Sequence, residues 1–158
     1  MTSDARFEDG REGPLNLGAL DADDLRVISA LVQDAVFPAS EMTWRGKDRR
    51  FALLLNRFRW EDRGRDRHGP ERVRSLLVFG NVQRVASQGV PRGDAETVLS
   101  LLALDWQPGD APGGVLELQL AGDGAIRLEV EALEVNLRDV TRPYRAPSGR
   151  VPGHPDDL

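Results

Sequence analysis

The spacing of apolar residues along this chain changes once, near Glu41. Before that point, Leu25, Ile28 and Leu31 recur every three or four residues, as on one face of a helix. After it, apolar and polar residues mostly alternate, as in strands with one buried face. One helical segment followed by consecutive strands predicts a small α+β domain with a mostly antiparallel sheet, curled into a barrel or roll.

The helix is predicted over residues 22–35. Asp21 is suited to the N-cap, and two aspartates in the next turn place carboxylates near the positive end of the helix dipole. Pro38 marks the end of the helix, because a proline disfavours helical backbone at the residue before it, here Phe37.

The strands are predicted where alternating segments are bounded by turn residues. They cover residues 42–45, 50–60, 72–79, 82–86, 98–106, 115–120 and 125–130. The segment 133–140 fits either a strand or a short helix, and the alternation of Leu133, Val135 and Leu137 favours the strand.

A single domain is predicted over residues 18–140, since 158 residues with 40% hydrophobic content suffice for one core. It is flanked by a flexible leader, residues 1–17, and by a proline-rich extended tail, residues 141–158. Residues 51–87 and 99–138 share the order strand, tryptophan, loop, strand. This order suggests a pseudo-repeat of two β halves, although ordinary β-sheet patterning produces it too.

The composition argues against several classes of protein. The chain has no cysteine, which excludes disulfides, thiolate metal sites and cysteine nucleophiles. Its amino terminus is polar and acidic, unlike a signal peptide. Its longest apolar runs are far shorter than the roughly 20 residues needed to cross a bilayer. We therefore predict a cytoplasmic protein without membrane contact.

Positive charge is concentrated in the window Arg45–Arg74. This window holds 11 of the 21 Lys and Arg residues and five acidic residues, so its net charge is +6. Since the whole chain carries −5, the remaining residues carry −11. A charge separation of this size bears on partners rather than on fold.

The candidate binding residues lie in this window. In a strand, Arg57 and Arg59 point to one face while Phe58 and Trp60 point to the other. That pattern gives either a basic binding surface beside aromatic rings, or two solvated arginines backed by core aromatics. The candidate binding set is Arg49, Arg50, Arg57, Arg59, Trp60, Arg63, Arg72 and Arg74.

No catalytic constellation is recognisable. The two histidines, His68 in a charged loop and His154 in the tail, do not form a metal-ligand pattern. Neither a serine elbow nor a glycine-rich phosphate loop occurs. The carboxylates between Glu117 and Glu134 alternate with apolar residues, as on the wet face of a sheet. We therefore predict no metal, no cofactor and no catalytic residue, with a carboxylate-only enzyme site as an alternative.

These observations favour a non-catalytic binding or adaptor domain that contacts another protein, or a second copy of itself, through residues 45–74. Self-association would use the acidic helix start and the carboxylates of residues 116–134 as the opposite pole. Single-stranded RNA binding by the same strand is the alternative, because arginines hold phosphates and aromatic rings stack on bases. The negative net charge argues against it.

Five segments carry a resemblance to a known family: LNLGALDADDLRVISALVQDAVFPASEMTW, RRFALLLNRFRWED, VQRVASQGV, LAGDGAIRLEVEALEV and DVTRPYRAPSG. Together they span most of the chain. They resemble the alphaproteobacterial family known as domain of unknown function twenty-nine forty-eight. The resemblance implies no activity, ligand or catalytic residue, so it assigns no role to any position here.

Overall fold

The computed structural model describes residues 3–4, 13–62, 64, 69–90, 95–145 and 152. Within them lie one α-helix, one short 3-10 helix and twelve strands. The helices are α1 (Ala22–Leu31) and η2 (Ala39–Glu41). The strands are β1 (Ser3–Asp4), β2 (Asn16–Ala19), β3 (Ala35–Pro38), β4 (Met42–Arg45), β5 (Arg50–Phe58), β6 (Glu71–Phe79), β7 (Val82–Gln88), β8 (Val98–Pro108), β9 (Gly114–Leu120), β10 (Ala125–Val130), β11 (Val135–Asp139) and β12 (Tyr144–Arg145).

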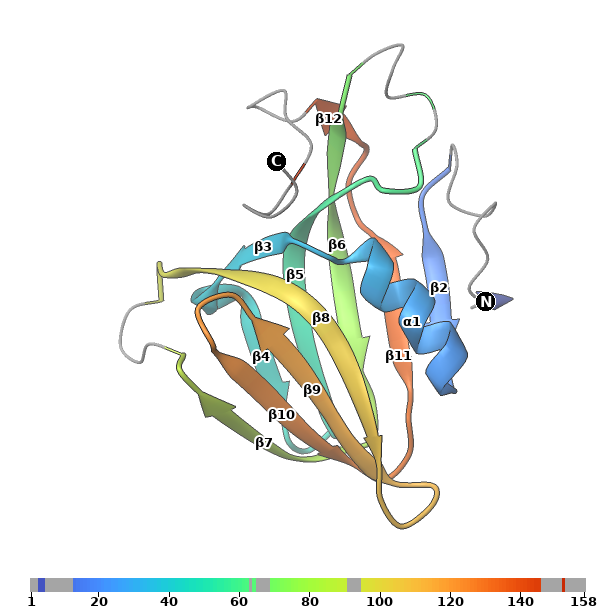
Figure 1. Cartoon of the computed structure of the whole chain (residues 1–158), viewed down its shortest axis with the longest axis vertical. Coiled ribbons are helices and arrows are strands. Elements are labelled where there is room, and N and C mark those ends of the chain that lie inside the picture. The colour runs from blue at the N-terminus through green and yellow to red at the C-terminus, as the bar shows by residue number, and fades with distance from the viewer. Residues whose placement is uncertain are drawn as a thin grey trace.

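The strands form one curled sheet (Figure 1). Its order is β1-β2-β11-β6-β5-β3-β8-β9-β10-β7, with β4 also beside β5 and β12 also beside β6. The β1–β2 pair is parallel, and the other described pairs are antiparallel. The predicted α+β class with a mostly antiparallel sheet is therefore confirmed. The sheet is not closed, so the predicted barrel is not confirmed.

Helix α1 begins as predicted and ends earlier. The Asp21 carboxylate accepts a hydrogen bond from the Asp24 amide at 2.8 Å, which caps the first turn. Leu25, Ile28 and Leu31 are buried, and the helix packs against β2 and β8. The predicted continuation to residue 35 is wrong, because β3 begins at residue 35 and pairs with β8. Pairing with a neighbouring strand outweighs the local helical spacing.

The core lies between the two halves of the curled sheet. Alternate residues of each strand point into it, as the period of two requires. On β9 and β10 these are Leu116, Leu118, Leu120, Ile126, Leu128 and Val130, all of them buried. Helix α1 supplies the remaining apolar cover from one side (Figure 1).

The two halves proposed as a pseudo-repeat are not built alike. The β5–β6 and β8–β9 pairs do correspond, since both are antiparallel neighbours in sequence. However, β7 does not pair with β6 and crosses to β10. Likewise, β11 belongs to the second half in sequence but pairs with β6 of the first half. This exchange ties both halves into one sheet.

Both ends of the predicted domain contribute further structure. Leu15 and Leu17 are buried, and β2 pairs with β11, so the core begins before residue 18. Residues 133–140, for which the sequence allowed a strand or a short helix, contain the strand β11. The favoured prediction of a strand is therefore confirmed. Tyr144 lies in β12, where its hydroxyl accepts a hydrogen bond from the side chain of Asn56. Residues 146–151 and 153–158 of the predicted tail lie outside the described residues.

Candidate functional site

The two arginines at the centre of the candidate set are buried. Arg57 is 0% exposed and Arg59 is 5% exposed. Arg57 continues the inward series of β5, after Leu53 and Leu55. Both interpretations of the sequence placed these arginines in water, and on that point both are wrong. Neither side chain is available to a ligand at the surface.

Arg57 occupies a site built from charged and polar side chains. Its two terminal nitrogens donate to the two carboxylate oxygens of Glu61 at 2.8 and 2.9 Å. Its Nη2 also donates to both oxygens of Asp139 at 3.0 Å, and its Nε donates to Ser75 Oγ at 3.1 Å. Ser75 in turn donates to Asp139 at 2.6 Å. Two carboxylates and one hydroxyl thus satisfy one guanidinium.

Arg59 has its own carboxylates beside this cluster. Its Nη1 lies 2.5 Å from Glu71 Oε1 and 3.6 Å from Asp62 Oδ2, and its Nε lies 3.7 Å from Glu61 Oε2. Three of the five acidic residues in the basic window therefore neutralise the two buried arginines. These three acidic residues are already counted in the net charge of +6, so their pairing leaves the charge contrast unchanged. Across the boundary of the window, Asp139 pairs with Arg57 and Glu131 with Arg49.

The protonation of Arg57 follows from this site. Burial by itself lowers the pKa of the Arg57 guanidinium, but the hydrogen bonds and charges of Glu61 and Asp139 outweigh burial and raise the pKa. Arg57 therefore stays charged at neutral pH. Its role is to hold β5, β6 and β11 together.

Of the two aromatic residues in the same stretch, Phe58 is buried and Trp60 is half-buried. Phe58 is fully buried, and its ring meets that of Trp60 edge-on, with centroids 4.7 Å apart. Trp60 follows β5 in a turn, and its Nε1 donates to the Gln33 carbonyl at 3.0 Å. The predicted strand 50–60 thus ends two residues early. The Phe58 ring therefore offers no stacking platform for a base.

The remaining members of the candidate set divide into three groups. Arg49 pairs with Glu131 at 2.6 Å, and Arg72 donates to the side chain of Asn56 at 3.2 Å. Arg63 lies outside the described residues. Arg50 and Arg74 have exposed side chains, and neither forms an ion pair with another described residue.

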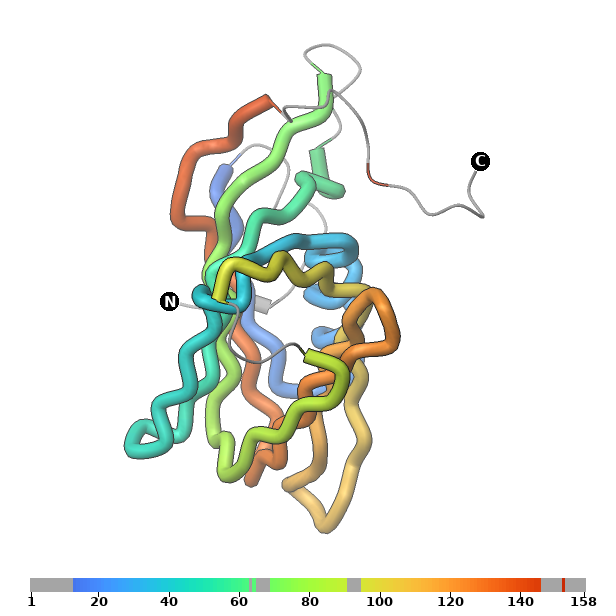
Figure 2. Tube along the Cα trace, turned by 90° about the vertical axis from the view of Figure 1, so that its left-hand side faces the viewer, coloured from blue at the N-terminus to red at the C-terminus, as the bar shows by residue number. Residues whose placement is uncertain are grey.

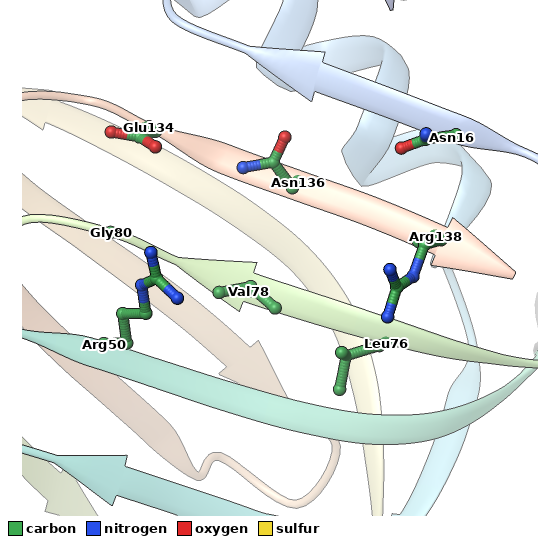
Figure 3. Close-up of a pocket in the computed structure, with 8 residues that line it drawn as sticks. All are labelled: Asn16, Arg50, Leu76, Val78, Gly80, Glu134, Asn136 and Arg138. Atoms are coloured by element: carbon green, nitrogen blue, oxygen red, sulfur yellow. The ribbon is translucent and has the colours of Figure 1, made fainter. Parts of the chain in front are cut away.

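The outer face of the sheet carries a groove across β2, β11, β6 and β5, with a volume of about 390 Å³ (Figure 3). Its lining residues are Asn16, Arg50, Leu76, Val78, Gly80, Glu134, Asn136 and Arg138. Leu76 and Val78 form an apolar floor, and Arg138 extends over it from β11. At the other end, Arg50 extends towards Gly80 from β5.

Three arginines frame this outer face. Arg74 lies two residues before Leu76 on β6 and is exposed, so it joins Arg50 and Arg138 on the same side of the sheet. Within the described part of the chain, none of these three guanidiniums has an ion-pair partner. Leu54 lies opposite Leu76 and widens the apolar strip between them. We call this surface the arginine face: Arg50, Leu54, Arg74, Leu76, Val78 and Arg138.

The sequence identified two of the three arginines and missed the third. Arg50 and Arg74 belong to the basic window, whereas Arg138 lies 64 positions beyond Arg74 in the chain. One signal could have found it. On the last long strand, Val135 and Leu137 occupy the buried face, which leaves Asn136 and Arg138 for the outer one.

On the outer face of the sheet, two described carboxylates pair with arginines. Glu117 forms an ion pair with Arg127 at 2.9 Å, and Glu129 forms one with Arg84 at 3.2 Å, both on the outside of the sheet. Among the described residues, no group of three or more His, Asp or Glu is arranged to hold a metal ion. None of the described helices has the length and apolar composition that crossing a bilayer requires.

The model of a family described as protein of unknown function (DUF2948) matches residues 15–154. The chain belongs to this family. The match spans β2 to β12, so DUF2948 covers both the buried arginine cluster and the arginine face. The search of curated proteins and the search of solved structures each gave no match.

Proposed function

We propose that this protein is a non-catalytic binding module that docks an acidic segment of another protein on the arginine face. The observation that carries the proposal is the presence of three unpaired guanidiniums around an apolar strip. Carboxylates of a partner would pair with Arg50, Arg74 and Arg138, while its apolar side chains would cover Leu54, Leu76 and Val78. Interfaces combine an apolar centre with charged positions at the rim in this way.

A second copy of the chain fits this surface less well. The acidic pole proposed for self-association is partly neutralised, because Glu117, Glu129 and Glu131 each pair with an arginine. Carboxylates that are paired in this way complement the arginine face less well. This supports a different protein as the partner.

RNA is also a weaker candidate. The groove contains the exposed carboxylate of Glu134, which would repel a phosphate backbone. Three cations provide few phosphate contacts, and the Phe58 and Trp60 rings pack against each other. The carboxylate-only enzyme has no supporting observation in the described groove. A cytoplasmic location and an alphaproteobacterial source stay predictions.

The test compares three forms of the full chain in a lysate of the native host. The face variant carries Arg50→Glu and Arg138→Glu. The control carries Arg26→Glu and Arg84→Glu, which change the net charge equally at two exposed ion pairs away from the arginine face. Captured material is divided between mass spectrometry and nucleic-acid sequencing, and any protein found is then purified for direct titration.

We expect one acidic protein that binds the wild type and the control and loses at least about tenfold in affinity for the face variant, because like charges then face its carboxylates. Its affinity for the wild type should also fall as salt rises. Equal binding by all three forms would remove the arginine face from consideration. Recovery of RNA that depends on Arg50 and Arg138 would replace the protein partner with a nucleic acid.

A further inference from the structure

A second feature, independent of the arginine face, lies where the curled sheet fails to close. Strand β7 pairs with β10 along one edge, and β4 pairs with β5 along one edge. No described strand pairs with the other edge of either. Figure 2 looks at the molecule from the side on which both strands lie.

The opening between these two strands is bounded at both ends by main-chain hydrogen bonds. At one end, the Val82 amide of β7 donates to the Arg49 carbonyl at 2.8 Å. At the other, the Ala39 amide donates to the Thr97 carbonyl at 2.8 Å, which ties η2 to the segment before β8. The opening is therefore a fixed gap in the sheet, and we call it the seam.

The seam exposes side chains that belong to the inner face of the sheet. It contains a cavity of about 160 Å³ lined by Met42, Trp44, Phe51, Val85, Ser87, Val90 and Ile126. Trp44 lies opposite Phe51 and Ser87 opposite Ile126 in the strand register. Phe51 and Ile126 are core residues, yet Trp44 is 41% exposed because no strand covers it.

We infer that the seam accepts an extended segment of another protein, which pairs with β7 as an added strand and places one uncharged apolar side chain in the cavity. Unpaired strand edges bind extended peptides through main-chain hydrogen bonds, and pockets for alternate side chains give specificity. The segment would cover Trp44 and extend the sheet beyond its present end at β7.

The chemistry of the lining specifies the side chain that enters. None of the lining residues is charged, so a carboxylate or ammonium there would be left without a partner. Apolar cavities of about 150 Å³ hold a benzene-sized molecule, which corresponds to a phenylalanine ring or a leucine side chain.

The length of the seam favours a peptide over a second copy. Strand β4 has four residues and β7 has seven, so the added strand has about the same length. The two strands together offer far fewer residues than the roughly 20–30 a side that a stable protein interface uses. The occupant is therefore a short segment, bound reversibly.

The test selects peptides from a displayed library of random 12-residue sequences on the immobilised full chain. Selected peptides are titrated against Ser87→Arg, which fills the cavity, and against Ala86→Arg. Ala86 lies next to Ser87 on β7 but on the outer face, opposite Arg127. The Ala86→Arg substitution therefore adds the same charge outside the seam. Thermal unfolding of each variant establishes that it is folded.

We expect enriched peptides to alternate apolar and polar residues around one Phe or Leu. Their affinity should fall at least tenfold with Ser87→Arg and stay within twofold with Ala86→Arg. Methylation of the peptide's backbone nitrogens should abolish binding, and peptide binding should slow hydrogen exchange in β7.

Four results would overturn the inference. No enriched sequence, or equal binding by the Ser87→Arg variant, would show that the seam does not take a peptide. Binding that survives backbone methylation would exclude an added strand. A dimer in sedimentation that dissociates with Ser87→Arg would identify the occupant as a second copy. None of these results depends on the arginine face, so both proposals can fail separately.

Discussion

The guanidinium of Arg57 is enclosed by the carboxylates of Glu61 and Asp139 and by the hydroxyl of Ser75. Taking ions out of water costs several kcal/mol each, and only close pairing offsets that cost. Arginine suits this position because its planar fork presents five donors in a fixed geometry and pairs bidentately with a carboxylate, whereas the ammonium of a lysine is a compact point charge. The cluster also reaches the N-terminal segment, since Asp139 accepts a hydrogen bond from the Leu15 amide at 2.9 Å.

Replacement of this arginine should be strongly destabilising. We expect Arg57→Met to lower the free energy of unfolding by about 3–5 kcal/mol, because two buried carboxylates lose their partner. Arg26→Met is the control, since it removes an exposed ion pair with Asp23 and should cost at most about 1 kcal/mol. Urea unfolding measures both. Arg57→Lys should fall between wild type and Arg57→Met, and wild-type stability in Arg57→Met would contradict the structural role.

Strands β8 and β9 approach each other closely at Gly114. In the register, Pro108 lies opposite Gly114. A Cβ at Gly114 would lie 2.5 Å from the Gln107 carbonyl oxygen and 2.6 Å from the ring of Trp106. The Trp106 ring thus occupies the space of the missing side chain, and it packs against the core. Glycine allows the two strands to pair here because it has no side chain to collide with the Gln107 carbonyl and the Trp106 ring. Its backbone dihedral angles do not require glycine.

A single methyl group should disturb this pair of strands. We expect Gly114→Ala to cost about 1–3 kcal/mol, because the main chain or the Trp106 ring must shift. Thermal and urea unfolding would measure the loss. Gly13→Ala is the matched control, since no atom lies within 4 Å of its Cβ position. Equal stability of Gly114→Ala and wild type would mean that the hairpin adjusts without cost.

At the scale of the whole molecule, the core joins the two ends of the domain. Strand β2 precedes the helix and β11 follows the last hairpin, yet they are neighbours, with Leu17 opposite Leu137. Both leucines are buried. The β5–β6 pair then links β11 to the rest of the sheet. Assembly of the core therefore needs contacts between distant parts of the sequence.

The contribution of the N-terminal strand can be measured directly. We expect Leu17→Ala to lower the free energy of unfolding by about 2–5 kcal/mol, through lost burial and the cavity left behind. Leu20→Ala, three residues later at a position that is 75% exposed, should change it by no more than about 0.5 kcal/mol. If both variants matched wild type, residues 15–17 would behave as a leader, as the sequence suggested.

The sequence by itself determined the class of fold, because apolar spacing reports which face of each element is buried. It predicted the start of α1 at Ala22, the hairpin of β9 and β10, and the strand β11. It could not give the direction in which Arg57 points. The alternation on β5 is the same whether an inward position holds a leucine or an arginine with its carboxylates.

Only the tertiary structure decided which charges are available. Glu61 lies four residues from Arg57, but Asp139 lies 82 residues away, and the sheet order that joins them is not a local property. The same order brings Arg138 to the side of Arg50 and Arg74, and it leaves one edge of β4 and one edge of β7 without a described partner strand. Local spacing determines the faces of an element, whereas contacts between distant strands determine which of those faces stay open.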